Sequence, residues 1–432
     1  MRRFPDGFAW GVATSAFQVE GALDADGRGP SIWDTFAGES GETGAVACDH
    51  YRRWRDDVDL LAELGVNAYR FAIAWPRLFP TGRAPLEPRG RDHYSRLIDA
   101  LLERGIEPIA TLYHWDLPRP LDWRERATAE RFAEYAAACF DAYGDRVSRW
   151  VTINEPWIVG VLGYQLGLHA PGVRDLRACV EAMHHLLLGH GLAAHALGGR
   201  GRVGVANALF PHVPATPSDA DAEAARLSDG YVNRWLLDPV QKGAYPDDLR
   251  VLWEERVGEL DFVRDGDLAT IATRSDFIGV NYYTRRVVRA APGRHPFPWE
   301  VVVVGDVPMT GGDWEIVPAA FTALLTRLAR DYPGTPLLIT ENGGIFPEHV
   351  HDARRIAFLR DHLAAVHDAI ERGAPVEGYC HWSFLDNFEW ALGYGPRFGL
   401  VHVDYETQER TIKDSGRAYA AIARANALEA AA

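Results

Sequence analysis

Two glutamates, each at the end of a β-favouring stretch, are the residues best placed for chemistry in this sequence. Glu155 follows the run Trp-Val-Thr-Ile-Asn at 150–154, and Glu341 follows Pro-Leu-Leu-Ile-Thr at 336–340. Two facing carboxyl groups can serve as proton donor and nucleophile, which is what hydrolysis of a glycosidic bond requires. Taken alone, each has an ordinary interpretation, Glu155 as the cap of a following helix and Glu-Asn-Gly at 341–343 as a turn.

The residues after each glutamate predict how its backbone is held. Pro156 has no N–H and biases the residue before it toward an extended backbone, so we expect Glu155 to be extended at a rigid strand tip. Gly343 and Gly344 carry no Cβ, and we expect them to let the backbone approach a ligand.

Strand-like and helix-like segments alternate along the whole chain. Helical periodicity, ended in most cases by glycine, covers 58–64, 97–102, 132–140, 176–197, 319–332 and 356–370. Strands are predicted at 8–14, 66–73, 106–113, 150–155, 203–206, 276–283, 336–341 and 376–383. This α/β alternation predicts a single (β/α)8 TIM barrel over residues 1–432, although an open doubly wound sheet has the same period.

In such a barrel the active site lies at the C-terminal ends of the strands. Polar and aromatic residues recur at seven of the eight predicted strand ends, which indicates one shared site. They are Gln18, Arg70, His114, Trp115, Asn154, Glu155, Asn281, Tyr283, Glu341 and Trp382. Many of the 14 tryptophans stand beside polar residues, which suits a cleft for the C–H faces and hydroxyls of sugars.

Composition excludes several classes of partner. The net charge of −15, with no basic stripe, argues against nucleic acid and anionic membranes. The four cysteines are widely separated and form no CxxC pair, which fits a reducing cytoplasm. We expect neither a signal peptide nor a membrane span, because no apolar run approaches the roughly 18 residues that a span needs. The sequence leaves the oligomeric state open.

Ordered motifs along the chain carry a family resemblance. They are Phe-Ala-Trp-Gly-Val-Ala-Thr-Ser at 8–15, Gln-Val-Glu-Gly at 18–21, Gly-Arg-Gly-Pro-Ser-Ile-Trp-Asp at 27–34, Tyr-Arg-Phe at 69–71, Tyr-His-Trp-Asp-Leu-Pro at 113–118, Thr-Ile-Asn-Glu-Pro-Trp at 152–157, Asn-Tyr-Tyr-Thr at 281–284, Thr-Glu-Asn-Gly at 340–343 and Leu-Asp-Asn-Phe-Glu-Trp at 385–390. The chain resembles the β-glucosidases of glycoside hydrolase family 1 essentially from end to end.

The resemblance implies a retaining double displacement with Glu155 as general acid/base and Glu341 as nucleophile. Arg70 and Tyr283 would hold Glu341 ionised and oriented, and Asn281 would support Glu155 or the aglycone side. Without the resemblance, a buried structural ion-pair partner is an equal interpretation of Arg70. A retaining pair lies about 5 Å apart, so we expect the charge of Glu341 to raise the pKa of Glu155.

The resemblance also implies a site for the sugar, with a β-glucoside or short β-linked oligosaccharide as substrate and β-galactosides and β-fucosides as further substrates. Asn154 would bind the 2-hydroxyl; the other implied sugar contacts are Gln18, His114, Glu389 and Trp390, with Trp382 as floor and Trp115 and Phe398 as walls. A carboxylate at 389 accepts hydroxyls and repels phosphate, which argues against a 6-phospho-glycosidase. His114 could instead be a satisfied core histidine.

No metal or cofactor is expected. The histidine-rich helix around His184, His185, His190 and His195 lacks an HExxH motif, so we interpret it as a solvated or packed helix.

Some loops depart from the family pattern, namely the short segment from Pro118 to Trp123, Gly344 in place of a common alanine, and the abbreviated link to Arg354. They border the aglycone side, for which Trp157, Trp33, His169 and residues 296–304 are candidates. A non-cleaving scaffold would typically lack one glutamate, and a thioglucosidase would carry glutamine at 155. A transglycosylase would use the same residues.

Overall fold

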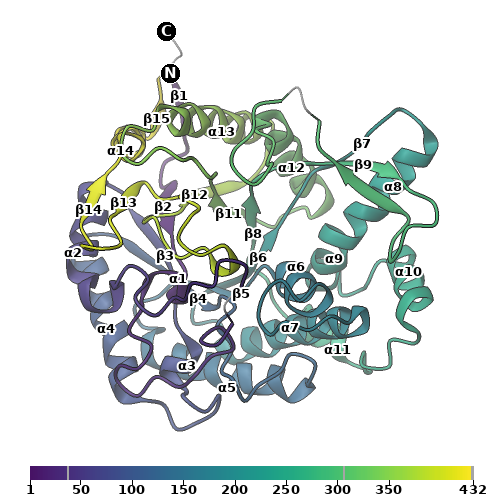
Figure 1. Cartoon of the computed structure of the whole chain (residues 1–432), viewed down its shortest axis with the longest axis horizontal. Coiled ribbons are helices and arrows are strands. Elements are labelled where there is room, and N and C mark those ends of the chain that lie inside the picture. Colours follow the sequence, from purple (N-terminus) through teal and green to yellow (C-terminus); the bar gives the residue numbers. More distant parts are fainter. Residues whose placement is uncertain (37, 305–306, 430–432) are drawn as a thin grey trace.

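Eight parallel strands close into a barrel at the centre of the computed structural model, which describes residues 1–36, 38–304 and 307–429 (Figure 1). Each strand lies within two residues of its predicted bounds, and the closed order confirms the barrel over an open sheet. In chain order the strands are β2 (Ala9–Ala13), β3 (Ala68–Ala72), β4 (Glu107–Tyr113), β5 (Arg149–Asn154), β6 (Arg202–Ala208), β8 (Phe277–Tyr282), β11 (Leu337–Asn342) and β12 (Val376–Trp382).

Long helices surround the barrel, as the apolar periodicity predicts (Figure 1). They are α2 (His50–Glu63), α4 (Pro88–Glu103), α5 (Arg126–Tyr143), α7 (Leu176–Leu197), α12 (Pro318–Asp331) and α13 (Ala353–Glu371). Helix α7 shows how the sequence sets both ends. The Asp175 side chain accepts a hydrogen bond from the Ala178 N–H, and Gly198 ends the helix with a φ of 58°.

The connection between β6 and β8 is far richer than the sequence analysis indicates. It holds the helices α8 (Asp219–Asp229), α9 (Trp235–Lys242), α10 (Asp247–Val257) and α11 (Asp267–Ile271), and a π-helical turn η2 (Gly230–Arg234). These helices are short, so each shows little periodicity, and aromatic contacts such as Trp235 stacked on Tyr245 hold them together. Ser218, whose side chain caps the start of α8, is the one residue type here that could have indicated a helix from the sequence.

A small sheet of β7 (His212–Pro214), β9 (Arg286–Ala290) and β10 (Trp299–Val302) stands beside the barrel in the order β10-β9-β7 (Figure 1). It was also not predicted. Its position matters for the site, because β7 follows β6 and β9 follows β8, so both strands lead away from the barrel mouth.

The remaining elements close the structure. They are β1 (Arg2–Arg3), α1 (Ala16–Val19), α3 (Trp75–Leu78), α6 (Pro156–Ile158), a π-helical segment η1 (Val159–Gln165), a 3-10 turn η3 (Trp390–Leu392), β13 (Val401–Val403), β14 (Arg410–Ile412), α14 (Asp414–Ala425) and β15 (Ala427–Leu428). Strands β1 and β15 pair, which brings the two ends of the chain together (Figure 1).

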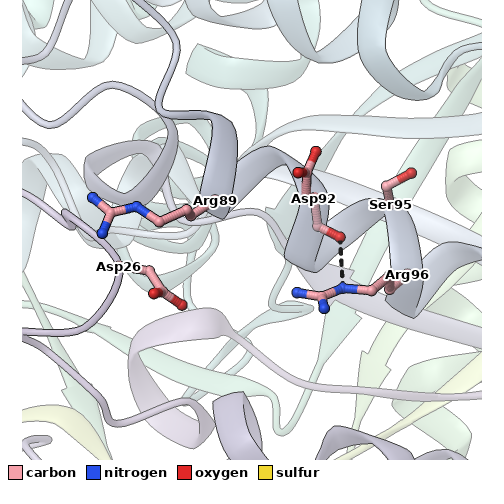
Figure 2. A pocket seen from close by; sticks show the side chains of 5 residues that line it. All are labelled: Asp26, Arg89, Asp92, Ser95 and Arg96. Carbon is pink, nitrogen blue, oxygen red and sulfur yellow. Dashed lines mark hydrogen bonds between the residues drawn. The ribbon is translucent and has the colours of Figure 1, made fainter.

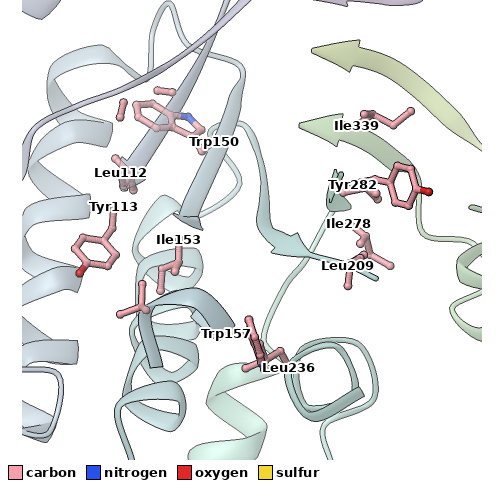
Figure 3. Close-up of a cluster of buried hydrophobic side chains, with 14 of the residues drawn as sticks. Leu112, Tyr113, Trp150, Ile153, Trp157, Leu209, Leu236, Ile278, Tyr282 and Ile339 are labelled. Carbon is pink, nitrogen blue, oxygen red and sulfur yellow. The ribbon is translucent and has the colours of Figure 1, made fainter. Parts of the chain in front are cut away.

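Two layers of apolar packing hold the barrel. Outside it, side chains such as Trp150 and Ile153 of β5 and Leu112 of β4 are buried beneath the helices (Figure 3). Inside it, Ile109, Val151 and their counterparts on other strands form a separate cluster that continues up to Trp382 and Phe398. The barrel is therefore a filled core whose uppermost layer is aromatic and forms the base of the mouth. In the described part of the chain, no helix is long and apolar enough to cross a bilayer.

Candidate active site

A continuous network of hydrogen bonds joins the ends of four barrel strands around the two glutamates. Glu341 is the last residue but one of β11, and Glu155 directly follows β5. Arg70 lies on β3 and Asn281 on β8. All four side chains are at least 95% buried. The structure thus brings together polar groups that lie up to 271 residues apart in the chain.

Glu341 is held by a cation and a hydroxyl. The Arg70 guanidinium donates to one carboxylate oxygen at 2.5 Å, and the Tyr283 hydroxyl donates to the other at 2.6 Å. Arg70 also donates to Thr111 Oγ1 at 3.0 Å, which fixes the guanidinium plane. Burial raises the pKa of Glu341, but Arg70 and Tyr283 both act against this rise and favour the ionised form.

Glu155 has a different set of neighbours. Its carboxyl accepts a hydrogen bond from the Asn281 amide at 2.8 Å and has no ion pair with any described residue. Burial, and secondly the charge of Glu341, raise its pKa to about 8. The expected effect of Glu341 on Glu155 is therefore present, although burial is the larger cause. The surroundings therefore favour the protonated form of Glu155 and the ionised form of Glu341.

The backbone of Glu155 differs from the prediction. We expected an extended conformation before Pro156, but Glu155 adopts φ 50° and ψ 64°, in the left-handed region. Its N–H donates to the Ala206 carbonyl at 2.7 Å, a bond to the next barrel strand, and this tertiary contact overrides the pre-proline preference. Glu155 does precede helix α6, but its side chain makes no capping bond, so the carboxyl remains available in the site.

Asn154 organises the network through both ends of its amide. Its Oδ1 accepts from Arg70 at 2.6 Å and from Asn281 at 3.1 Å, so its Nδ2 must face His114, where it lies 3.1 Å from Nε2. His114 Nε2 is therefore an acceptor, and the proton lies on Nδ1. Burial lowers the pKa of His114 well below its usual range and keeps the ring neutral.

The Nδ1–H of His114 has no partner among the described residues although it is buried. A buried donor without an acceptor is costly, and a sugar hydroxyl would satisfy it. This feature distinguishes His114 from the satisfied core histidine that was the alternative interpretation.

Gln18 and Glu389 form a second polar pair. The Gln18 amide nitrogen donates to Glu389 at 2.9 Å and to Asn387 Oδ1 at 2.9 Å, while its oxygen accepts from Ser15. Gln18 therefore positions the carboxyl of Glu389. Burial, followed by the charge of Glu341, raises the pKa of Glu389 to about 8.

Aromatic side chains enclose these polar groups. Trp382 and Trp390 lie on His114 with ring centroids 5.6 and 5.9 Å away, and the Trp115 indole N–H donates to the Asn154 carbonyl at 3.0 Å. Phe398 packs against Tyr283 at 6.2 Å. Every residue predicted for the site is thus connected to it.

The comparisons with known proteins agree with this geometry. The model of glycosyl hydrolase family 1 matches residues 1–428. The chain belongs to this family. A β-glucosidase A from Thermotoga maritima is 42% identical and covers 99% of each chain, and a bifunctional β-D-glucosidase/β-D-fucosidase from Bifidobacterium breve is 44% identical over 95% of this chain and 96% of its own. The solved family 1 β-glucosidase from T. maritima matches with a TM-score of 0.95 at 41% identity over 99% of both chains.

Membership of glycosyl hydrolase family 1 confirms the resemblance inferred from the motifs. Several supporting residues were nevertheless missed. Thr340 donates to Asn281 Oδ1 at 2.6 Å, and Trp314 packs on Tyr283 with centroids 5.1 Å apart. Thr340 directly precedes Glu341 on an inward-facing strand end, which was a usable signal. Trp314 lies in a loop whose path the sequence does not reveal.

The glycines after Asn342 are required by neighbouring protein atoms. A Cβ on Gly343 would lie 1.9 Å from the Trp382 carbonyl oxygen, and one on Gly344 would lie 2.7 Å from the Thr310 methyl carbon. Both glycines therefore leave room for neighbouring protein atoms, and the expectation that they also let the backbone approach a ligand stays a prediction.

The aglycone candidates of this family 1 chain fall into two groups. Trp33 and His169 pack on each other at 5.3 Å, and His169 also contacts Trp115, so this pair continues the aromatic wall of the site. Trp157 instead packs on Phe210 at 6.3 Å, beside the small sheet. Of the segment 296–304, Phe297 reaches this side through Tyr231, at 4.6 Å.

Other chemistry-bearing groups lie outside the site. A surface cavity of about 430 Å³ is lined by Asp26 and by Arg89, Asp92, Ser95 and Arg96 of helix α4, and no barrel strand contributes to it (Figure 2). Three of the α7 histidines, His184, His185 and His190, are buried, and His184 contacts Tyr245 and Asp267, each at 2.9 Å, whereas His195 is exposed. Among the described residues, no group of three or more metal-ligating side chains gathers.

Proposed function

We propose that the chain is a retaining β-glycosidase that removes terminal non-reducing β-D-glucosyl residues from short oligosaccharides and from aryl and alkyl glycosides. The observation that carries this proposal is the difference between the hydrogen-bond partners of two buried carboxyls. Glu341 accepts hydrogen bonds from Arg70 and Tyr283, whereas Glu155 accepts one from the neutral amide of Asn281. One carboxyl is thus prepared as an anion and the other as an acid, which is the division of labour that the reaction requires.

In the first step Glu341 would attack the anomeric carbon while Glu155 gives its proton to the leaving oxygen. The C–O bond to the aglycone breaks as the bond to the Glu341 carboxylate forms, and a covalent glycosyl-enzyme results. Asn281 supports this geometry, because its amide bonds to Glu155 and also favours the anion of Glu341. One amide serving both carboxyls favours the shorter separation of about 5 Å, typical of retention.

In the second step the charges are reversed. Glycosylation removes the negative charge of Glu341, so the pKa of Glu155 falls and its carboxylate can take a proton from water. Water then attacks the anomeric carbon, releases Glu341 and yields the sugar with its β configuration retained. An acceptor alcohol in place of water would give transglycosylation by the same residues.

The sugar would be held by the polar groups around the pair. Asn154 retains an amide N–H beyond the one directed at His114, which suits the 2-hydroxyl, and His114 offers its unpartnered Nδ1–H. Gln18 orients Glu389 to accept two neighbouring hydroxyls, with Trp382 and Trp390 beneath the ring. A carboxyl at this position offers a 6-phosphate no positive charge, which disfavours phosphorylated sugars.

The proposal includes β-galactosides and β-fucosides as further substrates. The similarity to the bifunctional β-D-glucosidase/β-D-fucosidase supports this breadth. It also includes a place in the cytoplasm, where the enzyme would cleave short β-linked glucose oligosaccharides derived from cellulose. The low cysteine count and their burial as free thiols support a reducing compartment.

Azide rescue tests the two carboxyl roles. Glu155→Ala should still be glycosylated by activated aryl glucosides but should stall before deglycosylation, and azide should restore turnover. Glu341→Ala should lose both steps. Normal turnover of natural disaccharides by Glu155→Ala would contradict the assignment.

A substrate panel tests the sugar site. We expect activity on aryl β-glucoside, β-galactoside and β-fucoside, and little on 6-phospho-β-glucoside. Activity confined to the phosphorylated compound would overturn the role given to Glu389.

A further inference from the structure

Arg286 places a cation at the mouth of the barrel, on the side of Glu155. Its guanidinium carbon lies 4.6 Å from the centroid of the Trp157 ring and 4.3 Å from that of Phe210. Trp157 follows the end of β5, Phe210 the end of β6, and Arg286 itself the end of β8. These strands are consecutive in the barrel, so the cation and both rings belong to one sector of the mouth.

The guanidinium of Arg286 has no hydrogen bond or ion pair with any residue in the described ranges. Its neighbours differ in this respect, since Arg285 donates to Glu315 at 2.7 Å and Arg289 to Glu300 at 2.8 Å. Burial lowers the pKa of Arg286 to about 10, so it remains charged at neutral pH. The side chain is only partly buried, and its N–H donors are free to meet an acceptor from outside.

The two aromatic rings leave these donors unused. An aromatic ring attracts the flat face of a guanidinium, and this contact does not use the N–H groups that point outward in the guanidinium plane. The nearby titratable groups do not neutralise the cation: His212, buried on the adjacent strand β7, is kept neutral by burial, which lowers its pKa to about 3. The Tyr231 hydroxyl donates to Gln165 at 2.8 Å.

The position of Arg286, Trp157 and Phe210 relative to Glu155 determines which part of a substrate they would contact. The inference rests on the proposed function, in which Glu155 protonates the leaving oxygen. Trp157 lies two residues beyond Glu155, so the sector that holds it and Arg286 is at the strand end that carries the group expected to protonate the leaving oxygen. With a net charge of −15, the chain otherwise repels anions, and an acidic leaving group would need a local cation.

We propose that Arg286 binds an anionic group on the aglycone, so that the enzyme favours β-glucosides of aromatic carboxylic acids. The aromatic part of such an aglycone lies beside Phe210, which is partly exposed, and its carboxylate takes two parallel N–H bonds from the guanidinium fork. Arg286 is therefore a specificity-determining residue of the leaving-group side.

The test uses a pair of substrates that differ in charge but hardly in shape, 4-carboxyphenyl and 4-carbamoylphenyl β-D-glucoside. The quantity measured is the ratio of their kcat/KM values in wild type, Arg286→Met and Arg286→Lys. Comparing ratios between variants cancels the intrinsic reactivity of each leaving group. Arg289→Met is the matched control, because Arg289 lies on the same strand but pairs with Glu300.

We expect Arg286→Met to lower the carboxylate-to-carboxamide ratio by about 10- to 100-fold, the range for a charge-assisted hydrogen bond. Arg286→Lys should retain part of the preference, and Arg289→Met should keep the wild-type ratio. Added salt should reduce the preference in wild type.

An equal ratio in wild type and Arg286→Met would overturn the inference, as would an equal loss in Arg289→Met. Such a result would leave the proposed function intact if 4-nitrophenyl β-D-glucoside is still hydrolysed. Failure of the wild type to hydrolyse any of the three glucosides would instead overturn the proposed function together with this inference.

Discussion

Two carboxyls that lie three residues apart, the buried Asp386 and the partly exposed Glu389, are held in opposite ways. Asp386 is fully buried, accepts from Lys413 at 2.8 Å and from Arg397 at 3.0 Å, and has a pKa of about 2. Glu389 accepts from the neutral amide of Gln18 and has a pKa of about 8. Burial raises the pKa in both cases, and cations outweigh it at Asp386 alone.

This contrast separates the structural cluster from the catalytic one. Around Asp386 the cations match the carboxylate, and the cluster ties β13, through His402, and Lys413 at the start of α14 to the loop after β12. At the mouth, Glu155 and Glu389 face the charge of Glu341, and the cation Arg70 contacts Glu341. Burial is common to both places, but only the mouth leaves carboxyls short of positive charge. Such a shortage costs stability and keeps a proton available for chemistry.

The strongest way to separate the two clusters is Glu155→Gln. Loss of the general acid should lower kcat/KM on disaccharides by about 10²- to 10⁴-fold. The unfolding free energy at pH 8 should stay the same or rise, because a neutral amide replaces a buried acid and can still accept from Asn281. Activity assays and urea unfolding of the same preparations would show both effects. A large loss of unfolding free energy would instead show that Glu155 stabilises the fold, as Asp386 does.

Lys413→Met should show the reverse pattern. It leaves Asp386 as a buried anion short of its cation, which should lower the unfolding free energy by about 3–5 kcal/mol. The folded fraction should keep its kcat at low temperature, since Lys413 contacts no residue of the site.

Lys242→Met is the control for that variant. Lys242 pairs with Asp238 at 2.9 Å, but its side chain is 48% exposed, so we expect a change of at most about 1 kcal/mol. If Lys413→Met and Lys242→Met changed the unfolding free energy equally, the ion pairs of Asp386 would not be important for the stability of the fold.

The effect expected from Tyr283→Phe is smaller than those of Glu155→Gln and Lys413→Met. It removes the hydroxyl that donates to Glu341 at 2.6 Å, a charge-assisted bond worth about 1.5–3 kcal/mol. The rate of glycosylation should fall about 10- to 100-fold, and the acid limb of the pH profile should move to higher pH, because the anion of Glu341 loses a donor. A rate loss with an unmoved acid limb would indicate that Tyr283 acts only through packing.

The sequence predicts the barrel well, because its signal is carried by local patterns. Eight strand positions could be located from apolar runs, and parallel closure brings their ends together whatever the loops do. The family motifs then assign Glu155, Glu341 and Arg70 to one place. Contacts between long loops have no such local signal. The small sheet that carries Arg286 was therefore missed, and so was its distance from Trp157.

Backbone strain was equally invisible in the sequence. Glu155, Trp115 and Trp390 all adopt positive φ, at 50°, 75° and 49°. Left-handed backbone costs a non-glycine residue on the order of 1 kcal/mol, and only tertiary contacts hold it there. In the case of Glu155 the bond to the Ala206 carbonyl supplies that contact, and no rule based on the following proline could anticipate it.

The change in unfolding free energy with pH has opposite signs for the two clusters. Asp386 has a folded pKa of about 2, below its usual 3.8, so its contribution is present above pH 4 and lost as the pH falls toward 2. Glu155 has a folded pKa of about 8, above its usual 4.5, so the folded state holds an extra proton between these values. Stability is therefore lost as the pH rises from 4.5 to 8, by about 1.4 kcal/mol per unit for a single group.

The difference in unfolding free energy between Glu155→Gln and wild type should accordingly grow from pH 5 to pH 8, as measured by urea unfolding at several pH values. Because Glu389 titrates in the same range, the variant should flatten the slope without abolishing it. Parallel curves would mean that Glu155 is ionised in the folded protein at neutral pH, and it could then not serve as the acid. The same titration should set the basic limb of kcat/KM near pH 8 in wild type, because loss of the Glu155 proton removes the leaving group's acid.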